Sequence, residues 1–191
     1  MYKQSGTIHM IMDFFESNQA YLLDNVRSAI FVGICPGSEE FDVIQKFCER
    51  GCQCLCIEVY RENCVHSIPD LGCVPIICTD MRNMKDLFVP QSVDMIWAKQ
   101  VLEHVPHDDA MGLLREWKEI ARQIVLVETP YGECPQGSEY DNPHDEHLCS
   151  VTPKMLFACG YDTWDVQEDI NPDPKDIRRH NLLGLWERPK I

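Results

Sequence analysis

Short apolar runs alternate with amphipathic segments through most of the chain, and this alternation restricts the possible folds more than any other feature. The runs are apolar over nearly their whole length, as in strands that are buried on both faces of a sheet. The segments between them place apolar residues at helical spacing. The sequence therefore predicts an α/β fold, a doubly wound and mostly parallel sheet with helices on both faces. The predicted strands of this part cover residues 28–34, 52–60, 74–80, 93–99 and 124–130.

The C-terminal part has a different pattern. Residues 161–169 and 181–189 read as two strands that are joined by a polar loop without a helix, which predicts an antiparallel hairpin at the edge of the sheet. Residues 182–186 would then form an apolar edge that could pair with another copy, so a homodimer is possible. The predicted helices cover residues 10–24, 39–51, 84–88, 108–123 and 153–160.

Size and composition narrow the class of protein. A length of 191 residues fits a single domain, residues 1–191, that can bury a core. The net charge of −14 argues against nucleic acid as a partner. The apolar runs are too short to cross a bilayer, and the first residues lack the pattern of a signal peptide. We therefore expect a cytoplasmic protein that binds neither nucleic acid nor membrane.

The chain contains eleven cysteines, which could suggest a disulfide framework or a metal site. The odd number and the missing export signal argue against disulfides. Cys52, Cys54 and Cys56 alternate along a predicted strand, so they share one face and fit the core as small apolar residues. Because the sequence has no pair of cysteines at CxxC spacing, no zinc site is expected from them.

Ligands of open α/β sheets bind beyond the carboxyl ends of the strands, so the residues that follow each strand are the candidate site. The first turn, FVGICPGSEEF, holds Gly33 and Gly37, which could let the backbone approach a ligand, although a plain strand-to-helix turn would have the same residues. Glu58 ends the second strand, 21 residues after Gly37, where an acid can bind ribose hydroxyls. After the third strand, Asp80 could bind an adenine amino group or cap a helix, and Met81 could pack on the ring.

The fourth strand and its exit carry the most specific pattern. In SVDMIWAKQVLEHVPHDD, Asp94 opens the strand and Leu102, Glu103 and His104 follow it. This segment resembles class I S-adenosylmethionine-dependent methyltransferases of the small-molecule type, and the resemblance extends over residues 25–188. It implies a seven-stranded sheet with an antiparallel last strand. It also implies S-adenosylmethionine as cofactor, with S-adenosylhomocysteine as product, and methyl transfer to an oxygen or nitrogen of a small-molecule acceptor.

The first turn departs from the motif of that family. Gly33 stands where the motif usually has an acid, Cys35 where it has its first glycine, and Glu39 where it has its last glycine. The resemblance implies that the adenosine lies between Glu58 and Asp80. The methionine part would run over the first turn, and the residues after the fourth strand would face its reactive end. The candidate cofactor-binding residues are Gly33, Cys35, Gly37, Glu58, Asp80, Met81, Lys99 and Gln100. The altered motif keeps two alternatives open: a non-catalytic binding or regulatory module, and a dehydrogenase that uses a nicotinamide cofactor.

The remaining candidates concern the acceptor. Residues 131–150 are polar and irregular and follow the fifth strand, which predicts a substrate-side loop; residues 1–25 would supply a helical lid. His104, His144 and His147 are candidate general bases because histidine titrates near neutral pH. Tyr131 and Glu146 are candidates for contact with the acceptor. The acidic and histidine side chains of residues 144–147 could also hold a metal, but a solvated loop is the preferred interpretation and no metal site is predicted.

Overall fold

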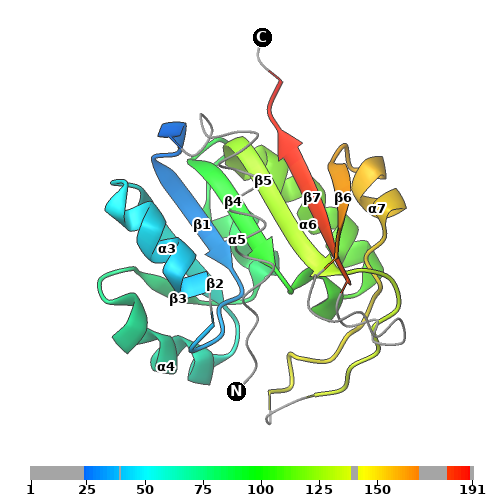
Figure 1. Ribbon diagram of the computed structural model, residues 1–191, viewed down its shortest axis with the longest axis horizontal. Coiled ribbons are helices and arrows are strands. Elements are labelled where there is room, and N and C mark those ends of the chain that lie inside the picture. Colours follow the sequence, from blue (N-terminus) through cyan, green and yellow to red (C-terminus); the bar gives the residue numbers. More distant parts are fainter. Residues whose placement is uncertain (1–23, 39, 139–141, 168–179, 190–191) are drawn as a thin grey trace.

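The structure, a computed structural model, describes residues 24–38, 40–138, 142–167 and 180–189, and only the backbone of residues 165–167 and 180. Seven strands form one sheet in the order β3-β2-β1-β4-β5-β7-β6 (Figure 1). The predicted lid and helix at the N-terminus lie almost wholly outside the described residues. The strands are β1 (Ser28–Val32), β2 (Gln53–Glu58), β3 (Ile76–Cys78), β4 (Val93–Lys99), β5 (Ala121–Pro130), β6 (Asp162–Gln167) and β7 (His180–Glu187).

The direction of the strands confirms the predicted fold class. Strands β3, β2, β1, β4 and β5 pair in parallel, whereas β7 runs antiparallel to both of its neighbours, β5 and β6. One expectation about the C-terminal pair is wrong. Since β7 lies between β5 and β6, it is an internal strand, and residues 182–186 offer no free edge to another copy.

Helices cover both faces of the sheet, with α3 in front of it and α6 behind it in Figure 1. The apolar residues of α3 pack on one face, and those of α6 and α7 pack on the other. The helices are α3 (Glu40–Glu49), α4 (Arg61–Leu71), α5 (Met84–Leu87), α6 (His107–Ile120) and α7 (Pro153–Ala158), with 3-10 turns η1 (Met81–Asn83) and η2 (Leu102–His104).

Helix α4 was not among the predicted helices. Its apolar residues Val65 and Ile68 are 52% and 56% exposed, and Pro69 lies inside the helix. The residues that it buries are Cys64, Ser67 and Leu71, of which only two are apolar in type. The sequence therefore lacks the regular apolar face that predicts a helix.

The boundary between α6 and β5 also differs from the prediction. Residues 121–123 were expected to continue the helix, because alanine, arginine and glutamine favour helices. They belong to β5 instead, and Ala121 pairs with Val93 of β4. Pairing with the sheet overrides the local preference, so the strand starts directly where the helix ends.

The core lies on both sides of the sheet. Cys52, Cys54 and Cys56 belong to the apolar layer between α3 and the sheet, as their alternation predicted. All eleven cysteines are free thiols. On the opposite layer, Trp117 and Tyr161 are almost fully buried, and the Tyr161 hydroxyl donates a hydrogen bond to the Leu114 carbonyl at 2.8 Å.

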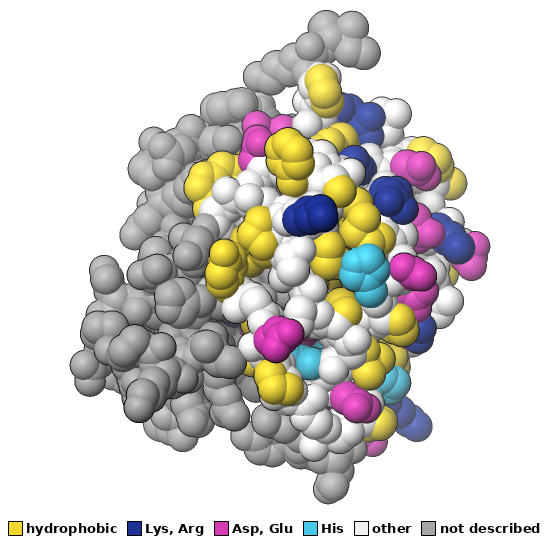
Figure 2. Space-filling model, turned by 90° about the vertical axis from the view of Figure 1, so that its right-hand side faces the viewer, with side chains coloured by type: hydrophobic (Ala, Val, Ile, Leu, Met, Phe, Trp, Pro, Cys, Tyr) yellow, Lys and Arg dark blue, Asp and Glu magenta, His cyan; other side chains and the backbone are white. Residues whose placement is uncertain are grey.

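The outer surface is mixed in character. Figure 2 shows the side of the molecule that carries α7 and β6, where hydrophobic side chains lie scattered among acidic and basic ones. No helix within the described residues is long and apolar enough to cross a membrane.

Candidate active site

A cavity of about 630 Å³ opens at the carboxyl ends of the parallel strands. It lies beside the junction of β1 and β4, where the strand order reverses, and such junctions bind ligands in open α/β sheets. The volume is in the usual range for a small-molecule site. Of the residues predicted for the site, nine line this cavity: Gly33, Cys35, Glu58, Asp80, Met81, Lys99, Gln100, His104 and His144. Gly37, Tyr131, Glu146 and His147 are not part of its lining.

The turn after β1 depends on Gly33. Its backbone has a φ of +77°, and its N–H donates a hydrogen bond to the Ile57 carbonyl at 2.9 Å. A Cβ atom at this position would lie 2.1 Å from Cγ1 of Val101, in the segment that follows β4. The turn therefore cannot hold the acidic side chain that the family motif has there unless Val101 moves.

Glu58 anchors the same turn from β2. Its carboxylate is buried, with 7% of the residue exposed, and accepts hydrogen bonds from the N–H groups of Ile34 at 2.9 Å and Tyr60 at 2.7 Å. Burial raises the pKa of Glu58, although these two N–H donors oppose the rise. Each oxygen keeps a further lone pair, so the carboxylate can still accept hydrogen bonds from a ligand in the cavity.

Asp80 lies in the turn between β3 and η1 and makes two kinds of contact. It caps η1 through the Arg82 N–H at 2.8 Å and forms an ion pair with the Arg82 guanidinium at 2.6 Å. The hydrogen bond from the Arg82 side chain lowers the pKa of Asp80. The predicted helix cap is confirmed, and the same residue lines the cavity.

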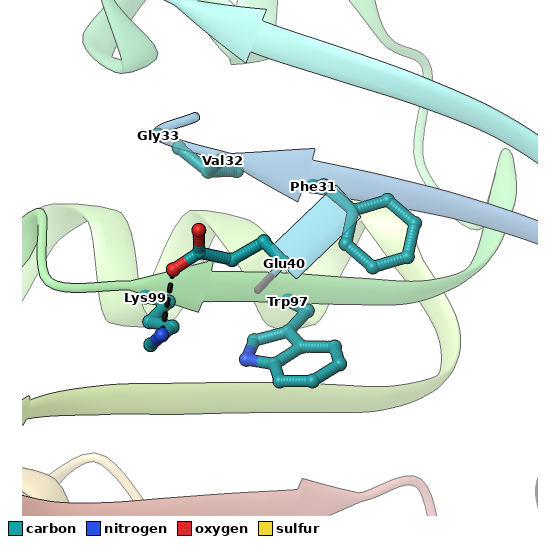
Figure 3. A pocket seen from close by; sticks show the side chains of 6 residues that line it. All are labelled: Phe31, Val32, Gly33, Glu40, Trp97 and Lys99. Carbon is teal, nitrogen blue, oxygen red and sulfur yellow. Dashed lines mark ion pairs between the residues drawn. The ribbon is translucent and has the colours of Figure 1, made fainter. Parts of the chain in front are cut away.

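Lys99, the last residue of β4, is buried with only 8% exposed and pairs with Glu40 of α3 at 2.6 Å. Figure 3 shows the Glu40 carboxylate reaching toward the Lys99 ammonium beside Gly33, Phe31 and Trp97. A space of about 10 Å³ lies among these side chains, which matches one water molecule. The second Glu40 oxygen is buried, and no described group donates a hydrogen bond to it. A carboxylate thus lies beside the turn although Gly33 carries none.

Gln100 continues the chain from Lys99 with a φ of +51°. Its N–H donates to the Glu128 carbonyl at 2.8 Å, and its side-chain amide donates to Asn181 of β7 at 3.2 Å. Asn181 in turn donates to the Glu128 carboxylate at 3.1 Å. These contacts fix the exit of β4 against β5 and β7, which positions Lys99 and Val101 at the cavity.

The loop after β5 supplies the far wall of the cavity. Asn142, His144 and Asp145 line it, and the Asn142 amide bonds Asp145 at 2.6 Å. His144 is exposed, and its ring lies 6.5 Å from that of Tyr60. Tyr131 is 39% exposed and lies outside the lining. The loop therefore meets the cavity through residues 142–145 and not through its start.

Sequence reasoning missed Glu40 as part of the site. One signal could have found it. A lysine that ends a fully buried strand needs a partner, since lysine is almost never buried alone. Glu39 and Glu40 were the acids in the adjoining turn, but the sequence could not distinguish them. Glu39 lies outside the described residues.

Comparison with solved structures identifies the fold. A SAM-dependent methyltransferase from Archaeoglobus fulgidus matches with a TM-score of 0.62 and 13% identity over 96% of this chain and 95% of that one. The chain has the class I methyltransferase fold. The 1,6-didemethyltoxoflavin-N1-methyltransferase of Burkholderia thailandensis, solved with S-adenosylhomocysteine, matches with a TM-score of 0.59 and 13% identity over 96% and 87% of the two chains.

The methyltransferase fold also occurs in proteins that are described by other reactions. The [4+2]-cyclase SpnF matches with a TM-score of 0.64 and 16% identity over 94% of this chain and 81% of that one. No protein-family model matches the sequence, and no curated protein matches it either. The similarity to solved structures therefore shows the fold alone.

Proposed function

We propose that this chain transfers a methyl group from S-adenosylmethionine to an oxygen or nitrogen of a small-molecule acceptor. The observation that carries the proposal is the position of Glu58 and Asp80, which lie at the carboxyl ends of the adjacent strands β2 and β3 and line one cavity with the Gly33 turn. In this arrangement Glu58 would bind the ribose hydroxyls and Asp80 the adenine, with Met81 against the ring. The methionine end would lie over Gly33 and Cys35, near Lys99 and Gln100.

The Lys99–Glu40 pair supports this proposal in spite of the altered motif. A donor of this kind carries both an ammonium and a carboxylate at its methionine end. Glu40 and Lys99 offer one charge of each sign beside the turn, at 2.6 Å from one another. We infer that Glu40 takes over from the acid that is absent at Gly33, and that Lys99 faces the donor's carboxylate.

Methyl transfer from a sulfonium needs little chemical activation by the protein. The sulfonium activates the methyl group, so the residues mainly align donor and acceptor and remove a proton where the acceptor has to lose one. Among the candidate bases, His104 and His144 line the cavity. Burial lowers the pKa of His104, which favours the neutral form that a base requires. The acceptor would enter between these histidines and the loop of residues 142–145.

Calorimetric titration of the purified chain with S-adenosylmethionine and S-adenosylhomocysteine tests the proposal, with NADH as the control. We expect both sulfur compounds to bind and NADH to give no heat. The Glu58→Gln variant should bind the donor about tenfold to a hundredfold more weakly, because it loses a hydrogen bond to a charged group. Glu49→Gln, an exposed change at the end of α3, is the matched control. Binding of NADH alone would overturn the proposal in favour of a dehydrogenase.

The second candidate is a binding or regulatory module that keeps the fold without methyl transfer. Three departures in the first turn favour it, and the similarity to a cyclase of the same fold is consistent with it. The two candidates differ in one measurement. If a well-folded sample binds neither S-adenosylmethionine nor S-adenosylhomocysteine, the enzyme proposal fails and the module remains.

A further inference from the structure

Three side chains with metal-binding atoms meet beside the cavity, and the proposed function uses only one of them, His104. Glu103 and His104 belong to η2, and His147 comes from the loop after β5. One ligand atom from each lies within 4.8 Å of those of the other two. The backbone holds the two segments together, because the N–H groups of Leu148 and Cys149 both donate to the Glu103 carbonyl, at 2.7 Å and 3.1 Å.

The burial and hydrogen bonding of Glu103 are the first indication that these three side chains hold a ligand. Only 2% of the residue is exposed. One carboxylate oxygen accepts a hydrogen bond from the Thr129 hydroxyl at 3.1 Å, while the other is buried with no hydrogen-bond partner among the described residues. A buried carboxylate oxygen without a partner is costly, and a cation would remove that cost.

The hydrogen bonds of the two histidines are the second indication of a ligand. Nδ1 of His104 lies 3.2 Å from the Glu146 carbonyl, and Nδ1 of His147 contacts the Cys134 carbonyl. A carbonyl oxygen only accepts hydrogen bonds, so each Nδ1 must carry a proton. In the neutral ring, Nε2 then holds the lone pair that binds a metal. Metal-binding histidines have this arrangement, in which the other nitrogen donates to a carbonyl or carboxylate. The rings lie 4.9 Å apart, edge to face.

We propose that Glu103, His104 and His147 form a binding site for a divalent transition-metal ion of the Zn²⁺ type. Two imidazoles and one carboxylate are a ligand set of zinc sites that keep a coordination position open. Nitrogen ligands lie about 2.0–2.1 Å from zinc, so ligand atoms up to 4.8 Å apart have to move closer together. The metal would therefore draw the loop around His147 onto η2.

The position of the site suggests its use. His104 also lines the cavity, so an ion bound there would lie at the wall where the acceptor enters. An acceptor hydroxyl bound to such an ion loses its proton more easily. This role rests on the proposed methyl transfer, whereas the metal site itself does not. If His104 binds the metal, His144 is the cavity histidine that is available for proton transfer.

Metal titration of the full chain tests the site without any donor present. The chain would be treated with a chelator, kept reduced and titrated with Zn²⁺ against a chromophoric competitor, and separately with Co²⁺. We expect about one ion per chain and visible Co²⁺ bands that indicate nitrogen and oxygen ligands. Because eleven cysteines could also bind these ions, a thiolate-to-cobalt charge-transfer band in place of those bands would overturn the proposal.

Variants identify the ligands. His147→Ala and Glu103→Gln should each weaken metal binding by at least about tenfold. His107→Ala is the matched control, since it removes an exposed histidine three residues after His104 and should leave affinity unchanged. The Gln variant retains the size of Glu103, and circular dichroism checks that it folds. Equal affinity in all four proteins, or no binding in the wild type, would contradict the site.

Discussion

At the scale of single residues, the turn after β1 shows how a departure from a motif can be accommodated. Gly33 has no room for a side chain because Val101 packs against it. The negative charge that this chain lacks at Gly33 is present on Glu40, which Lys99 holds in place. A buried ion pair of this kind fixes position more than it adds stability, since desolvation offsets much of the attraction.

The packing at Gly33 leads to a stability prediction. Gly33→Ala should lower the free energy of unfolding by about 1–3 kcal/mol more than Gly37→Ala, through overpacking. Both glycines have a positive φ, +77° and +73°, so both variants carry similar backbone strain. Only at Gly33 would the new Cβ meet another atom, whereas nothing lies within 4 Å at Gly37. Urea unfolding measures the difference.

A second substitution checks the cause of that difference. Adding Val101→Ala to Gly33→Ala removes the atom that the new Cβ would meet. Part of the lost stability should then return, measured against Val101→Ala alone. If the pair of changes is simply additive, the contact with Val101 is not the reason for the cost.

At the scale of elements, Asp94 fixes the start of β4 to β1. It is buried, with 4% exposed, and accepts hydrogen bonds from the N–H groups of Arg27 at 2.8 Å and Ser28 at 3.1 Å. Arg122 of β5 pairs with the same carboxylate. One side chain thus joins three strands. Burial alone would raise the pKa of Asp94, but the Arg27 N–H and the side chains of Gln123 and Arg122 lower it overall.

The lowered pKa of Asp94 predicts a pH dependence. The charged form is favoured in the folded state, so its contribution is complete above the unfolded pKa of about 3.9 and is lost as pH falls through the lower folded pKa. Asp94→Asn should therefore cost about 1.5–3 kcal/mol at neutral pH and less below about pH 4. Urea unfolding of both proteins across this range tests it, with exposed Asp70→Asn as control. A cost that stays constant down to pH 3 would contradict the assignment.

The elements also show what the sequence could predict. The buried parallel strands were predictable because short, continuous apolar runs between helical segments are typical of strands covered on both faces, and β4 agrees with its predicted bounds of residues 93–99. Helix α4 was missed because Val65 and Ile68 face outward. The place of β7 inside the sheet was missed because strand order depends on contacts such as Ile124 with Glu187, which local patterns do not contain.

The candidate site could likewise be predicted only in part from the sequence. Residues at the carboxyl ends of strands, such as Glu58 and Asp80, could be assigned to one cavity because parallel strands end at the same edge. Pairs that depend on how separate segments pack could not be predicted. Lys99 meets Glu40 only because the start of α3 reaches the end of β4, and His147 meets Glu103 only because the long loop returns to η2.

At the scale of the whole molecule, the cavity depends on several segments at once. Its walls come from the turns after β1, β2, β3 and β4 and from residues 142–145. A ligand that touches all of them would stabilise the folded chain as a unit, because the unfolded chain offers no such surface.

This dependence predicts a thermal shift. S-adenosylhomocysteine at a hundred times its dissociation constant should stabilise the chain by about 2.7 kcal/mol. For a protein of this size, that corresponds to a rise in melting temperature of about 5–11 °C. Differential scanning calorimetry with and without the ligand measures it, and NADH at the same concentration serves as the control. A melting temperature that does not change at a saturating concentration would show that the ligand does not bind the native cavity.

The internal position of β7 has a consequence for how the protein is made. On a ribosome the first five strands emerge well before residues 180–187, so β5 exposes an unpaired side until β7 is synthesised. Strand β6 emerges earlier than β7 but has no pairing partner until β7 arrives. During that interval the nascent chain presents an open sheet edge of the kind that binds chaperones or aggregates. Slow translation between residues 130 and 187 would prolong this exposure.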